Sequence, residues 1–292
     1  MKTAISTCIK DERLYLKEWL NWHFGIGFDH VYLYEDNGSE PHADIVKEYG
    51  DRVTLLPIDI AKDELETRER RQMNSYLYTV HTYGHLYDWI AFIDVDEFID
   101  FEEGYNLERL LSEHEECDGI LLSWLMYGAN GHIKKPEGGV IESYPEASPE
   151  IDYYNAIHGE MWMIKSIINM HRNPTFRNIH MVNRGVNMNG DIDTPALIFK
   201  KAWIRHYFTK SWEEWVTRIM KRGDLCNGNR RLKSFFTCNP DLAPRRKELI
   251  RSVAHMLPAG NKSLWLDRDI IAGGNVEHIK ALNNDRAKQI IR

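Results

Sequence analysis

The chain has 292 residues, 43% of them hydrophobic and 28% charged, which is the composition of a folded globular protein. This length accommodates one large α/β domain, or one domain with an extension. A net charge of −7 argues against a general nucleic-acid-binding protein, so we expect no nucleic acid among the partners. No run reaches the roughly 18–20 apolar residues of a membrane span, and the first eight residues have a strand-like pattern without the apolar core of a signal peptide. We therefore expect a cytoplasmic protein.

Strand and helix patterns alternate through the first 124 residues. The predicted strands cover residues 2–8, 30–34, 52–57, the run that leads into Asp94, and 119–124. The predicted helices cover residues 12–24, 43–49, 67–83 and 107–114, and the first of them carries Leu16, Trp19, Leu20 and His23 on one face. Such repeated strand–helix–strand units predict a mostly parallel sheet, whose ligand site lies at the carboxyl ends of the strands.

The second half of the chain has a different pattern. Residues 125–195 are interrupted by glycines and prolines, which is typical of loops that carry specificity. A strand is predicted over 196–206, and a helix with Trp212, Trp215, Val216 and Ile219 on one face follows it. The rest, up to Arg251, is predicted to be helical and basic.

Charge is unevenly distributed along the chain. Residues 1–199 contain 17 Lys and Arg against 35 Asp and Glu, a net charge of −18, whereas residues 200–251 contain 14 against 5, a net charge of +9. A basic segment of this kind can face phosphates, an anionic acceptor or a membrane surface, and it can equally be a set of solvated helices. Any peripheral contact with the inner face of a membrane is expected to run through it.

The most informative motif is an Asp-x-Asp pair at the end of a buried strand. Four apolar residues, Ile90 to Ile93, precede Asp94 and Asp96, as in a strand that is buried on both faces. In extended chain the two carboxylates would point the same way, about 6–7 Å apart. Two such oxygen ligands suit Mn²⁺ or Mg²⁺ held partly by the phosphates of a substrate. The alternative is a strand that simply ends in an acidic loop.

Seven segments carry a resemblance to a known family. In chain order they are Cys8-Ile9-Lys10-Asp11-Glu12, Tyr15-Leu16-Lys17-Glu18-Trp19, Tyr34-Glu35-Asp36-Asn37-Gly38-Ser39, Trp89 to Phe98, Trp124-Leu125-Met126-Tyr127-Gly128-Ala129-Asn130-Gly131, Lys165-Ser166-Ile167 and His206-Tyr207-Phe208-Thr209-Lys210-Ser211. With these segments the chain resembles bacterial GT-A glycosyltransferases, within the family-2-like group related to glycosyltransferase family 92. The resemblance covers about residues 3–215.

This resemblance implies a GT-A fold, an α/β architecture with a Rossmann-like, mostly parallel central sheet flanked by helices. The glycosyltransferase domain is then expected over residues 1–215, with a nucleotide-binding half at 1–124 and an acceptor and metal half at 125–215. Residues 216–292 are expected to form a basic helical C-terminal extension.

The implied reaction is the transfer of a sugar from a nucleoside-diphosphate sugar to the hydroxyl of a glycan or glycolipid acceptor. A divalent cation, Mn²⁺ or Mg²⁺, would neutralise the charge that develops on the leaving diphosphate. By the resemblance, Asp94 serves the donor and the metal, Asp96 binds the metal, and His206 is a further metal ligand. A histidine that merely ends a strand is the alternative for His206. Lys210 could reach the diphosphate as a point charge.

The nucleoside is expected at the ends of the first two strands. Thr7 and Asp36 occupy the positions at which similar enzymes hold the base and the ribose. Because a carboxylate can accept a hydrogen bond from the N3–H of uracil, Asp36 favours a UDP-sugar. Arg71 is the candidate for steering the diphosphate, with Arg68 and Arg70 as competitors and a charged helix face as the alternative.

The family is expected to invert the anomeric centre, and a single displacement needs a carboxylate base. The candidates are Glu142, Glu160 and Asp191. We favour Glu160, because it lies just before Lys165-Ser166-Ile167 and because Trp162 could stack on a sugar. The expected pathway is the assembly of a surface polysaccharide or lipopolysaccharide.

Two other functions fit the same kind of scaffold. A nucleotidyltransferase usually has a glycine-rich phosphate loop after its first strand, and the segment Cys8 to Glu12 has no glycine. A non-catalytic nucleotide-sugar or glycan-binding protein would be expected to lose the Asp-x-Asp pair or the late histidine, and both are present. The glycosyltransferase is therefore the favoured hypothesis.

Overall fold

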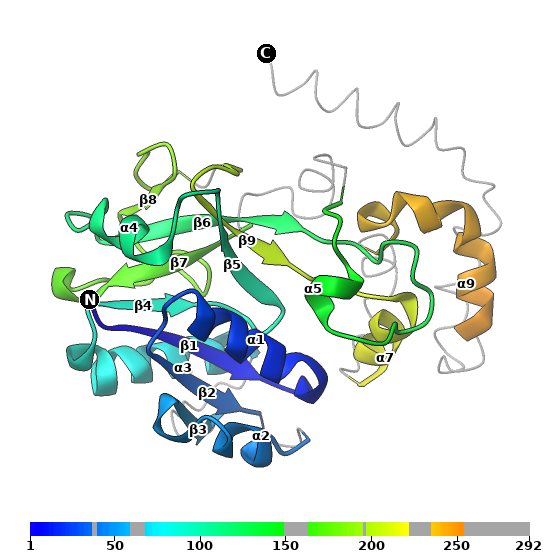
Figure 1. Cartoon of the computed structure of the whole chain (residues 1–292), viewed down its shortest axis with the longest axis horizontal. Coiled ribbons are helices and arrows are strands. Elements are labelled where there is room, and N and C mark those ends of the chain that lie inside the picture. Colours follow the sequence, from blue (N-terminus) through cyan, green and yellow to red (C-terminus); the bar gives the residue numbers. More distant parts are fainter. Residues whose placement is uncertain (37–39, 59–67, 149–162, 195–196, 222–234, 254–292) are drawn as a thin grey trace. The chain divides into compact units, whose positions relative to one another are not determined.

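The computed structural model describes residues 1–36, 40–58, 68–148, 163–194, 197–221 and 235–253 (Figure 1). Its contacts divide the chain into two compact units. Unit 1 comprises Met1–Gly128 and Glu137–Phe208, and unit 2 comprises Ala129–Pro136 and Thr209–Arg292. The functional division predicted from the sequence, with its boundary at residue 215, stays a prediction.

Unit 1 is built around a sheet whose described strands follow the order β3-β2-β1-β4-β7-β6-β9-β5, with β8 paired to β6. The strands are β1 (Thr3–Ile9), β2 (His30–Glu35), β3 (Val53–Pro57), β4 (Trp89–Phe92), β5 (Glu97–Phe101), β6 (Gly119–Met126), β7 (Ile164–Asn169), β8 (Gly185–Asn187) and β9 (Ala202–His206). The first four neighbours, β3, β2, β1 and β4, are parallel. Strand β7 is inserted antiparallel between β4 and β6, and β5 is antiparallel to β9.

Helices flank this sheet in unit 1. They are α1 (Arg13–Gly25), α2 (Ala43–Lys47), α3 (Arg68–Tyr83), α4 (Leu107–Ser112) and α5 (Val140–Ser143), with 3-10 turns η1 (Gly50–Arg52), η3 (Gly84–Leu86) and η4 (Met170–Arg172). The predicted fold class, an α/β protein with a mostly parallel central sheet, is confirmed. In unit 2 the described elements are α7 (Trp212–Lys221), η6 (Pro240–Arg245) and α9 (Arg246–Val253).

Helix α1 shows how the apolar pattern positions an element of the site. The predicted face is buried: Leu16, Trp19, Leu20 and His23 are all among its buried residues. This face packs on β5, the strand at one end of the sheet (Figure 1). The indole N–H groups of Trp19 and Trp22 donate hydrogen bonds to the carbonyl oxygens of Glu97 and Ile99, at 2.7 and 2.8 Å. The helix therefore satisfies backbone groups that an edge strand would otherwise expose.

Several predicted boundaries were wrong. The strand predicted over 196–206 begins only at Ala202, residues 197–201 lie outside it, and residues 195–196 are outside the described ranges. The strand predicted over 119–124 extends to Met126. Strand β5 was not predicted, because only four residues separate it from the end of β4.

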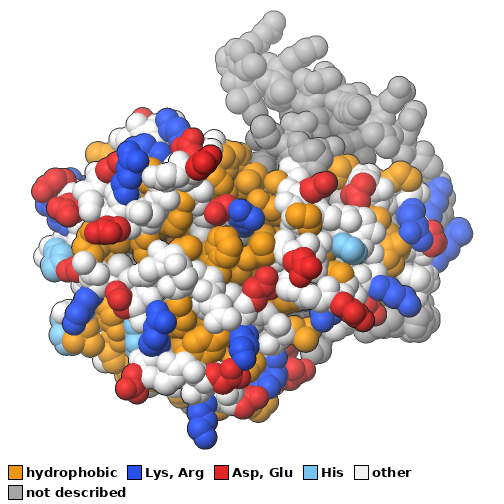
Figure 2. Space-filling view, viewed as in Figure 1, with side chains coloured by type: hydrophobic (Ala, Val, Ile, Leu, Met, Phe, Trp, Pro, Cys, Tyr) orange, Lys and Arg blue, Asp and Glu red, His pale blue; other side chains and the backbone are white. Residues whose placement is uncertain are grey.

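The surface of the described residues carries charges of both signs. On the face drawn in Figure 2, acidic and basic side chains are interspersed, with hydrophobic side chains reaching the surface between them. Among the helices within the described ranges, none combines the length and the apolar composition needed to cross a membrane.

Candidate active site

The Asp-x-Asp motif lies on a tight turn between β4 and β5. The backbone N–H of Glu97 donates to the carbonyl of Asp94 at 3.1 Å, and the Glu97 carboxylate accepts a hydrogen bond from the backbone N–H of Asp94 at 2.7 Å. The extended geometry expected for Asp94 and Asp96 was therefore wrong. Its cause is the sheet topology: the chain must leave the central strand β4 and enter β5, which pairs with β9 at the far end of the sheet.

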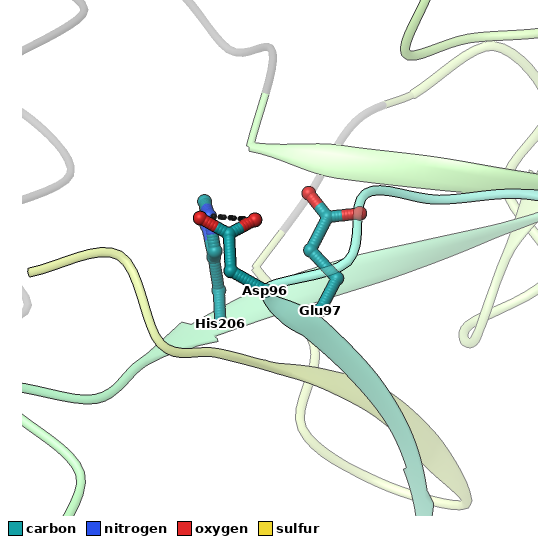
Figure 3. A group of neighbouring side chains, drawn as sticks. All are labelled: Asp96, Glu97 and His206. Atoms are coloured by element: carbon teal, nitrogen blue, oxygen red, sulfur yellow. Dashed lines mark ion pairs between the residues drawn. The ribbon is translucent and has the colours of Figure 1, made fainter. Parts of the chain in front are cut away.

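Three side chains at this turn form a group that could hold a metal ion. One ligand atom from each of Asp96, Glu97 and His206 lies within 4.8 Å of the others (Figure 3). The pairing of β5 with β9 sets Glu97 opposite His206, and the ring Nε2 of His206 is 3.7 Å from Asp96 Oδ1. The structure thus brings together Asp96 and His206, which are 110 positions apart in the chain.

The donor set of this group fits a divalent cation. Two carboxylates and an imidazole are ligands that Mn²⁺ accepts, and carboxylates also suit Mg²⁺. Glu97 is fully buried, and its Oε1 has no hydrogen-bond partner within the described residues. A buried carboxylate oxygen without a partner is costly unless a cation or a proton compensates it. The residues present therefore fit the metal ion that the motif predicts.

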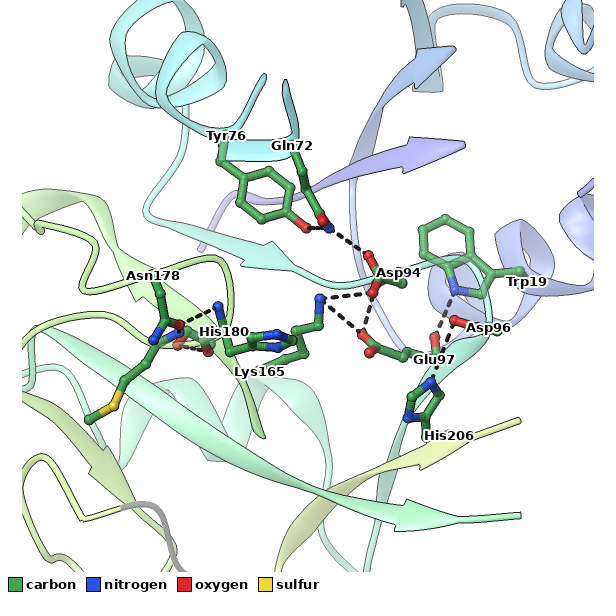
Figure 4. A network of polar contacts seen from close by, with 12 residues as sticks. Trp19, Gln72, Tyr76, Asp94, Asp96, Glu97, Lys165, Asn178, His180 and His206 are labelled. Carbon is green, nitrogen blue, oxygen red and sulfur yellow. Dashed lines mark hydrogen bonds and ion pairs between the residues drawn. The ribbon is translucent and has the colours of Figure 1, made fainter. Parts of the chain in front are cut away.

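Asp94 lies beside this group and is held by other side chains (Figure 4). Its Oδ1 accepts a hydrogen bond from the side-chain amide of Gln72 at 2.7 Å, and its Oδ2 is 3.0 Å from Lys165 Nζ. The same amide nitrogen of Gln72 donates to the hydroxyl of Tyr76 at 2.7 Å. Asp94 was predicted to serve both donor and metal; in the structure, both of its carboxylate oxygens are engaged by these protein groups.

The electrostatics of this cluster follow from its burial. Burial raises the pKa of Glu97 well above its usual value; Lys165 opposes that shift, while Asp94 and Asp96 add to it. Burial by itself would lower the pKa of Lys165, but the carboxylates of Asp94 and Glu97 outweigh it, so that this pKa is raised and Lys165 is a cation. Burial, assisted by the charge of Lys165, lowers the pKa of His180 to about 3.

A second polar cluster lies at the ends of β1 and β2. Asp36, which follows β2, forms ion pairs with Lys10 at 3.4 Å and with Arg71 at 3.1 Å. Thr7 is fully buried on β1, and its hydroxyl has no hydrogen-bond partner within the described residues. Asp36 and Arg71, predicted separately, are thus in direct contact. The side chains of Arg68 and Arg70 are outside the described residues.

Helix α3 connects the two clusters. The consecutive residues Arg71 and Gln72 reach Asp36 and Asp94, which follow the strands on either side of β1. Since β2, β1 and β4 are parallel neighbours, their carboxyl ends, where a ligand site was predicted, lie at one edge of the sheet, and the start of α3 spans that edge.

The remaining predicted residues lie elsewhere. Glu160, together with Trp162, is outside the described residues. Of the two alternative bases, Glu142 lies on α5, and Asp191 lies in the loop after β8, where it accepts a hydrogen bond from the amide of Asn187 at 3.2 Å. Lys210 belongs to unit 2, where it is buried and has a left-handed backbone with φ of +54°.

Three residues of the cluster around Asp94 were not predicted, namely Gln72, Glu97 and Lys165. A signal for Lys165 was present in the sequence, because a lysine within the apolar run from Met163 to Ile168 needs a buried partner. Glu97 directly follows the Asp-x-Asp motif and offers a third carboxylate. Nothing in the local sequence distinguishes Gln72.

The family model and the two curated relatives that match this chain all name the same family. The model of glycosyltransferase family 92 matches residues 4–233. A family 92 protein of Ricinus communis is 24% identical over 229 residues, covering 75% of this chain and 37% of the relative. Another, of Oryza sativa subsp. japonica, is 22% identical and covers 48% of this chain and 24% of the relative. The chain therefore spans well under half the length of these two relatives.

Similarity to solved structures is weaker. The crystal structure of S. aureus TarS 1-349 has 14% identity and a TM-score of 0.37, covering 91% of this chain and 78% of that one. Glucosyl-3-phosphoglycerate synthase from Mycobacterium tuberculosis, in complex with Mn²⁺, UDP and phosphoglyceric acid, has 12% identity and a TM-score of 0.33, covering 58% of this chain and 56% of that one. Scores this low support no conclusion about ligands. The family match, in contrast, covers most of the sequence, and the chain belongs to glycosyltransferase family 92.

Proposed function

We propose that this protein is a metal-dependent glycosyltransferase that moves a sugar from a nucleoside-diphosphate sugar, a UDP-sugar, to a hydroxyl of a glycan or glycolipid acceptor. The observation that carries the proposal is the convergence of Asp96, Glu97 and His206 on one point beside the carboxyl end of β4. Family membership supports the reaction class. The assembly of a surface polysaccharide or lipopolysaccharide, an inverting course and a cytoplasmic location belong to the same proposal and rest on the resemblance.

The proposal assigns a task to each part of the site. Asp96, Glu97 and His206 would hold Mn²⁺ or Mg²⁺, which when bound neutralises charge on the leaving diphosphate. Asp94 is assigned to the donor. Arg71 supplies a cation for the diphosphate at the junction between the two clusters. The role of Lys210 at the diphosphate stays a prediction from the sequence.

The nucleoside is assigned to Thr7 and Asp36. The hydroxyl of Thr7 is buried with no partner in the described part of the chain, which suits a group that completes its hydrogen bonding on ligand binding. Asp36 is paired with two cations, so hydrogen bonding to the N3–H of uracil requires it to share an oxygen with Lys10 or Arg71. Each Asp36 oxygen can accept more than one hydrogen bond, which allows this sharing.

The experiment that tests the proposal is a thermal-shift panel of UDP, GDP, CMP and dTDP, each with and without Mn²⁺. A ligand that binds only the folded protein, present at 100 times its dissociation constant, stabilises it by about 2.7 kcal/mol. We expect stabilisation by UDP that requires Mn²⁺ and that is lost in Asp96→Asn. Stabilisation by UDP without any metal dependence would contradict the metal assignment. No response to any nucleotide would instead favour a glycan-binding protein.

The catalytic base is proposed to be Glu160. Removing a general base lowers turnover by roughly a hundredfold or more, so Glu160→Gln should lower kcat by that factor with UDP-sugar binding retained. The same substitutions of Glu142 and Asp191 serve as matched comparisons. A loss confined to KM would make Glu160 a binding residue, and a loss of kcat in one of the other two variants would move the base there.

A further inference from the structure

The cluster around Asp94 contains a buried cation to which the proposed reaction gives no direct part. Lys165 lies in the middle of the sheet on β7 and is fully buried. Its Nζ is 3.0 Å from Asp94 Oδ2 and 3.8 Å from Glu97 Oε2 (Figure 4). The strand also contains Ile164, Ile167 and Ile168, which are apolar and buried. A lysine at such a position requires an explanation, because desolvating the ammonium is costly.

Fold stability alone does not explain it. Replacing a buried ion pair by apolar side chains of similar volume is often neutral or stabilising. Ile167, two positions along β7 and therefore on the same face of the sheet as Lys165, is also fully buried, so this part of the sheet accommodates an aliphatic side chain. A lysine in place of an aliphatic residue therefore suggests a requirement for charge at this point of the cluster.

The charges of the cluster show which negative charges the ammonium of Lys165 compensates. Asp94, Asp96 and Glu97 are three carboxylates within one turn, and Lys165 is the cation that pairs with two of them. The ammonium pairs with Asp94 and Glu97, whereas the imidazole of His206 lies beside Asp96. Asp94 and Glu97 therefore face the ammonium of Lys165. Glu97 also belongs to the candidate metal group with Asp96 and His206. With a divalent cation added at Asp96, Glu97 and His206, the charges of the cluster would balance.

Asp94 is held from two separate elements. Lys165 on β7 binds one carboxylate oxygen and Gln72 on α3 binds the other. Glu97 is fixed as well, because its Oε2 accepts the backbone N–H of Asp94 and faces Lys165, leaving Oε1 as the oxygen without a hydrogen-bond partner in the described residues. If Asp94 turned toward a metal ion at Asp96, Glu97 and His206, it would lose its bonds to Lys165 and Gln72, whereas Glu97 can offer Oε1 without losing a described hydrogen bond.

We propose that Lys165 is a positioning residue that keeps Asp94 out of the metal's coordination and directs it to the donor nucleotide. The inference rests on the proposed function. It implies that Asp94 contributes to nucleotide binding through the orientation that Lys165 imposes, and that Asp96, Glu97 and His206 hold the metal without Asp94. Losing Lys165 then removes a fixed positive charge and frees a carboxylate, both of which favour Mn²⁺ and disfavour the nucleotide.

The test compares two affinities in Lys165→Met. Mn²⁺ binding is followed by electron paramagnetic resonance without nucleotide, and UDP binding by calorimetry in saturating Mn²⁺. We expect Mn²⁺ to bind at least as tightly as in the wild type, and UDP to bind about 10- to 100-fold more weakly, the cost of losing a hydrogen bond to a charged group. General damage to the site would weaken both, and that result overturns the proposal; so does unchanged UDP binding.

A double-mutant cycle with Asp94→Asn makes the test specific. If Lys165 acts through Asp94, adding Lys165→Met to Asp94→Asn should change UDP affinity by less than about threefold, since interacting residues are not additive. A further tenfold loss in the double variant would overturn the proposal. The double variant is compared directly with Asp94→Asn if Lys165→Met alone does not fold, since it removes one of the two carboxylates that pair with Lys165.

The control is Lys201→Met. Lys201 is a partly exposed lysine of unit 1 that pairs with Glu113 at 2.9 Å, and its loss should leave both affinities at wild-type values. Failure of the proposed function has a different signature. A wild-type protein that binds Mn²⁺ but no nucleotide would reject the transferase. In that case the Mn²⁺ affinities of the wild type and of Lys165→Met would still test the role of Lys165. Weaker Mn²⁺ binding in the variant would contradict the proposal that Lys165 keeps Asp94 away from the metal.

Discussion

Glu97 lies directly opposite His206 in the antiparallel pair of β5 and β9, and this register places the imidazole 3.7 Å from the carboxylate of Asp96. The backbone reinforces the arrangement, since the N–H of Tyr207 donates to the carbonyl of Asp96 at 2.9 Å. A strand pairing therefore joins the motif at residue 96 to the histidine at residue 206. The precision of the candidate metal site depends on β5 being held in place.

The first prediction concerns Asp96 and His206, two of the three residues of the candidate metal group. Asp96→Asn and His206→Gln each remove a ligand while keeping a similar shape, so Mn²⁺ affinity should fall by about tenfold or more and the unfolding free energy should change little. Electron paramagnetic resonance and chemical denaturation measure the two quantities. Asp51→Asn, at an exposed position in η1, is the control and should bind Mn²⁺ normally. Normal Mn²⁺ affinity in both site variants would exclude this group as the metal site.

The second prediction separates the two roles of Glu97. Glu97→Gln keeps the hydrogen-bond acceptor for the N–H of Asp94 but removes a fully buried carboxylate, which is costly to desolvate. Mn²⁺ affinity should therefore fall at least about tenfold, while the metal-free protein becomes no less stable. Denaturation in the presence of a chelator measures the second effect. Marked destabilisation together with normal Mn²⁺ binding would show that Glu97 serves the fold rather than the metal.

The sequence predicted the parts of this arrangement that depend on local pattern. The apolar faces of α1 and of the early strands repeat with the period of their elements, so the first four strands and the buried face with Trp19 could be identified. The turn at Asp94 and the strand β5 could not, because the partner of β5 is residues 202–206 and no local signal specifies that pairing. The contacts of Lys165 likewise depend on β7 being inserted between β4 and β6.

The candidate site shows the same distinction. Asp94 and Asp96 were named because their motif follows a predicted buried strand, whereas Asp36 and His206 were named by resemblance. Gln72 belongs to the site through its hydrogen bond to Asp94, and Glu97 through its burial opposite His206. A single sequence does not specify these contacts, because the partners come from other elements of the fold. Arg71, rather than Arg68 or Arg70, is the arginine whose contact with Asp36 the structure describes.

The third prediction tests the support of β5 by α1. Trp19→Phe removes a buried hydrogen bond to the carbonyl of Glu97 and leaves space in the core, so the unfolding free energy should fall by about 2–4 kcal/mol. Trp22→Phe removes the same kind of bond to Ile99 from a part-buried position and should cost less, about 1 kcal/mol. Because Glu97 belongs to the metal group, Mn²⁺ affinity should also fall in Trp19→Phe. Equal effects of the two substitutions on Mn²⁺ affinity would argue against this coupling.

The fourth prediction concerns the ion pair of Arg71 with Asp36. Arg71→Gln removes a charge-assisted contact at the proposed diphosphate site, so UDP affinity should fall by about tenfold, which corresponds to roughly 1.4 kcal/mol. Arg109→Gln is the matched control, since Arg109 pairs with Glu113 on the exposed side of α4. Calorimetry with UDP in saturating Mn²⁺ measures both variants. If the two arginine variants bind UDP alike, Arg71 has no part in nucleotide binding.

The fifth prediction is a pH dependence of stability from His23. This side chain is fully buried between α1 and β5: its Nδ1–H donates to the carbonyl of Trp19 at 2.9 Å and its Nε2 accepts the N–H of Ile99 at 3.3 Å. Burial lowers its pKa from 6.5 to about 3. The unfolded chain therefore binds a proton that the folded protein excludes. The contribution of His23 to stability is complete above pH 6.5 and is lost as the pH falls toward 3.

The slope of that loss approaches about 1.4 kcal/mol per pH unit for one histidine. Chemical denaturation between pH 4 and pH 8 should show it, and His23→Gln should remove one histidine's share, because glutamine can accept the Ile99 hydrogen bond without titrating. His180, whose pKa is also lowered to about 3, contributes a second share that remains in this variant. An unchanged pH slope in His23→Gln would mean that His23 is protonated in the folded protein, and the pairing of α1 with the backbone of β5 would then need a different description.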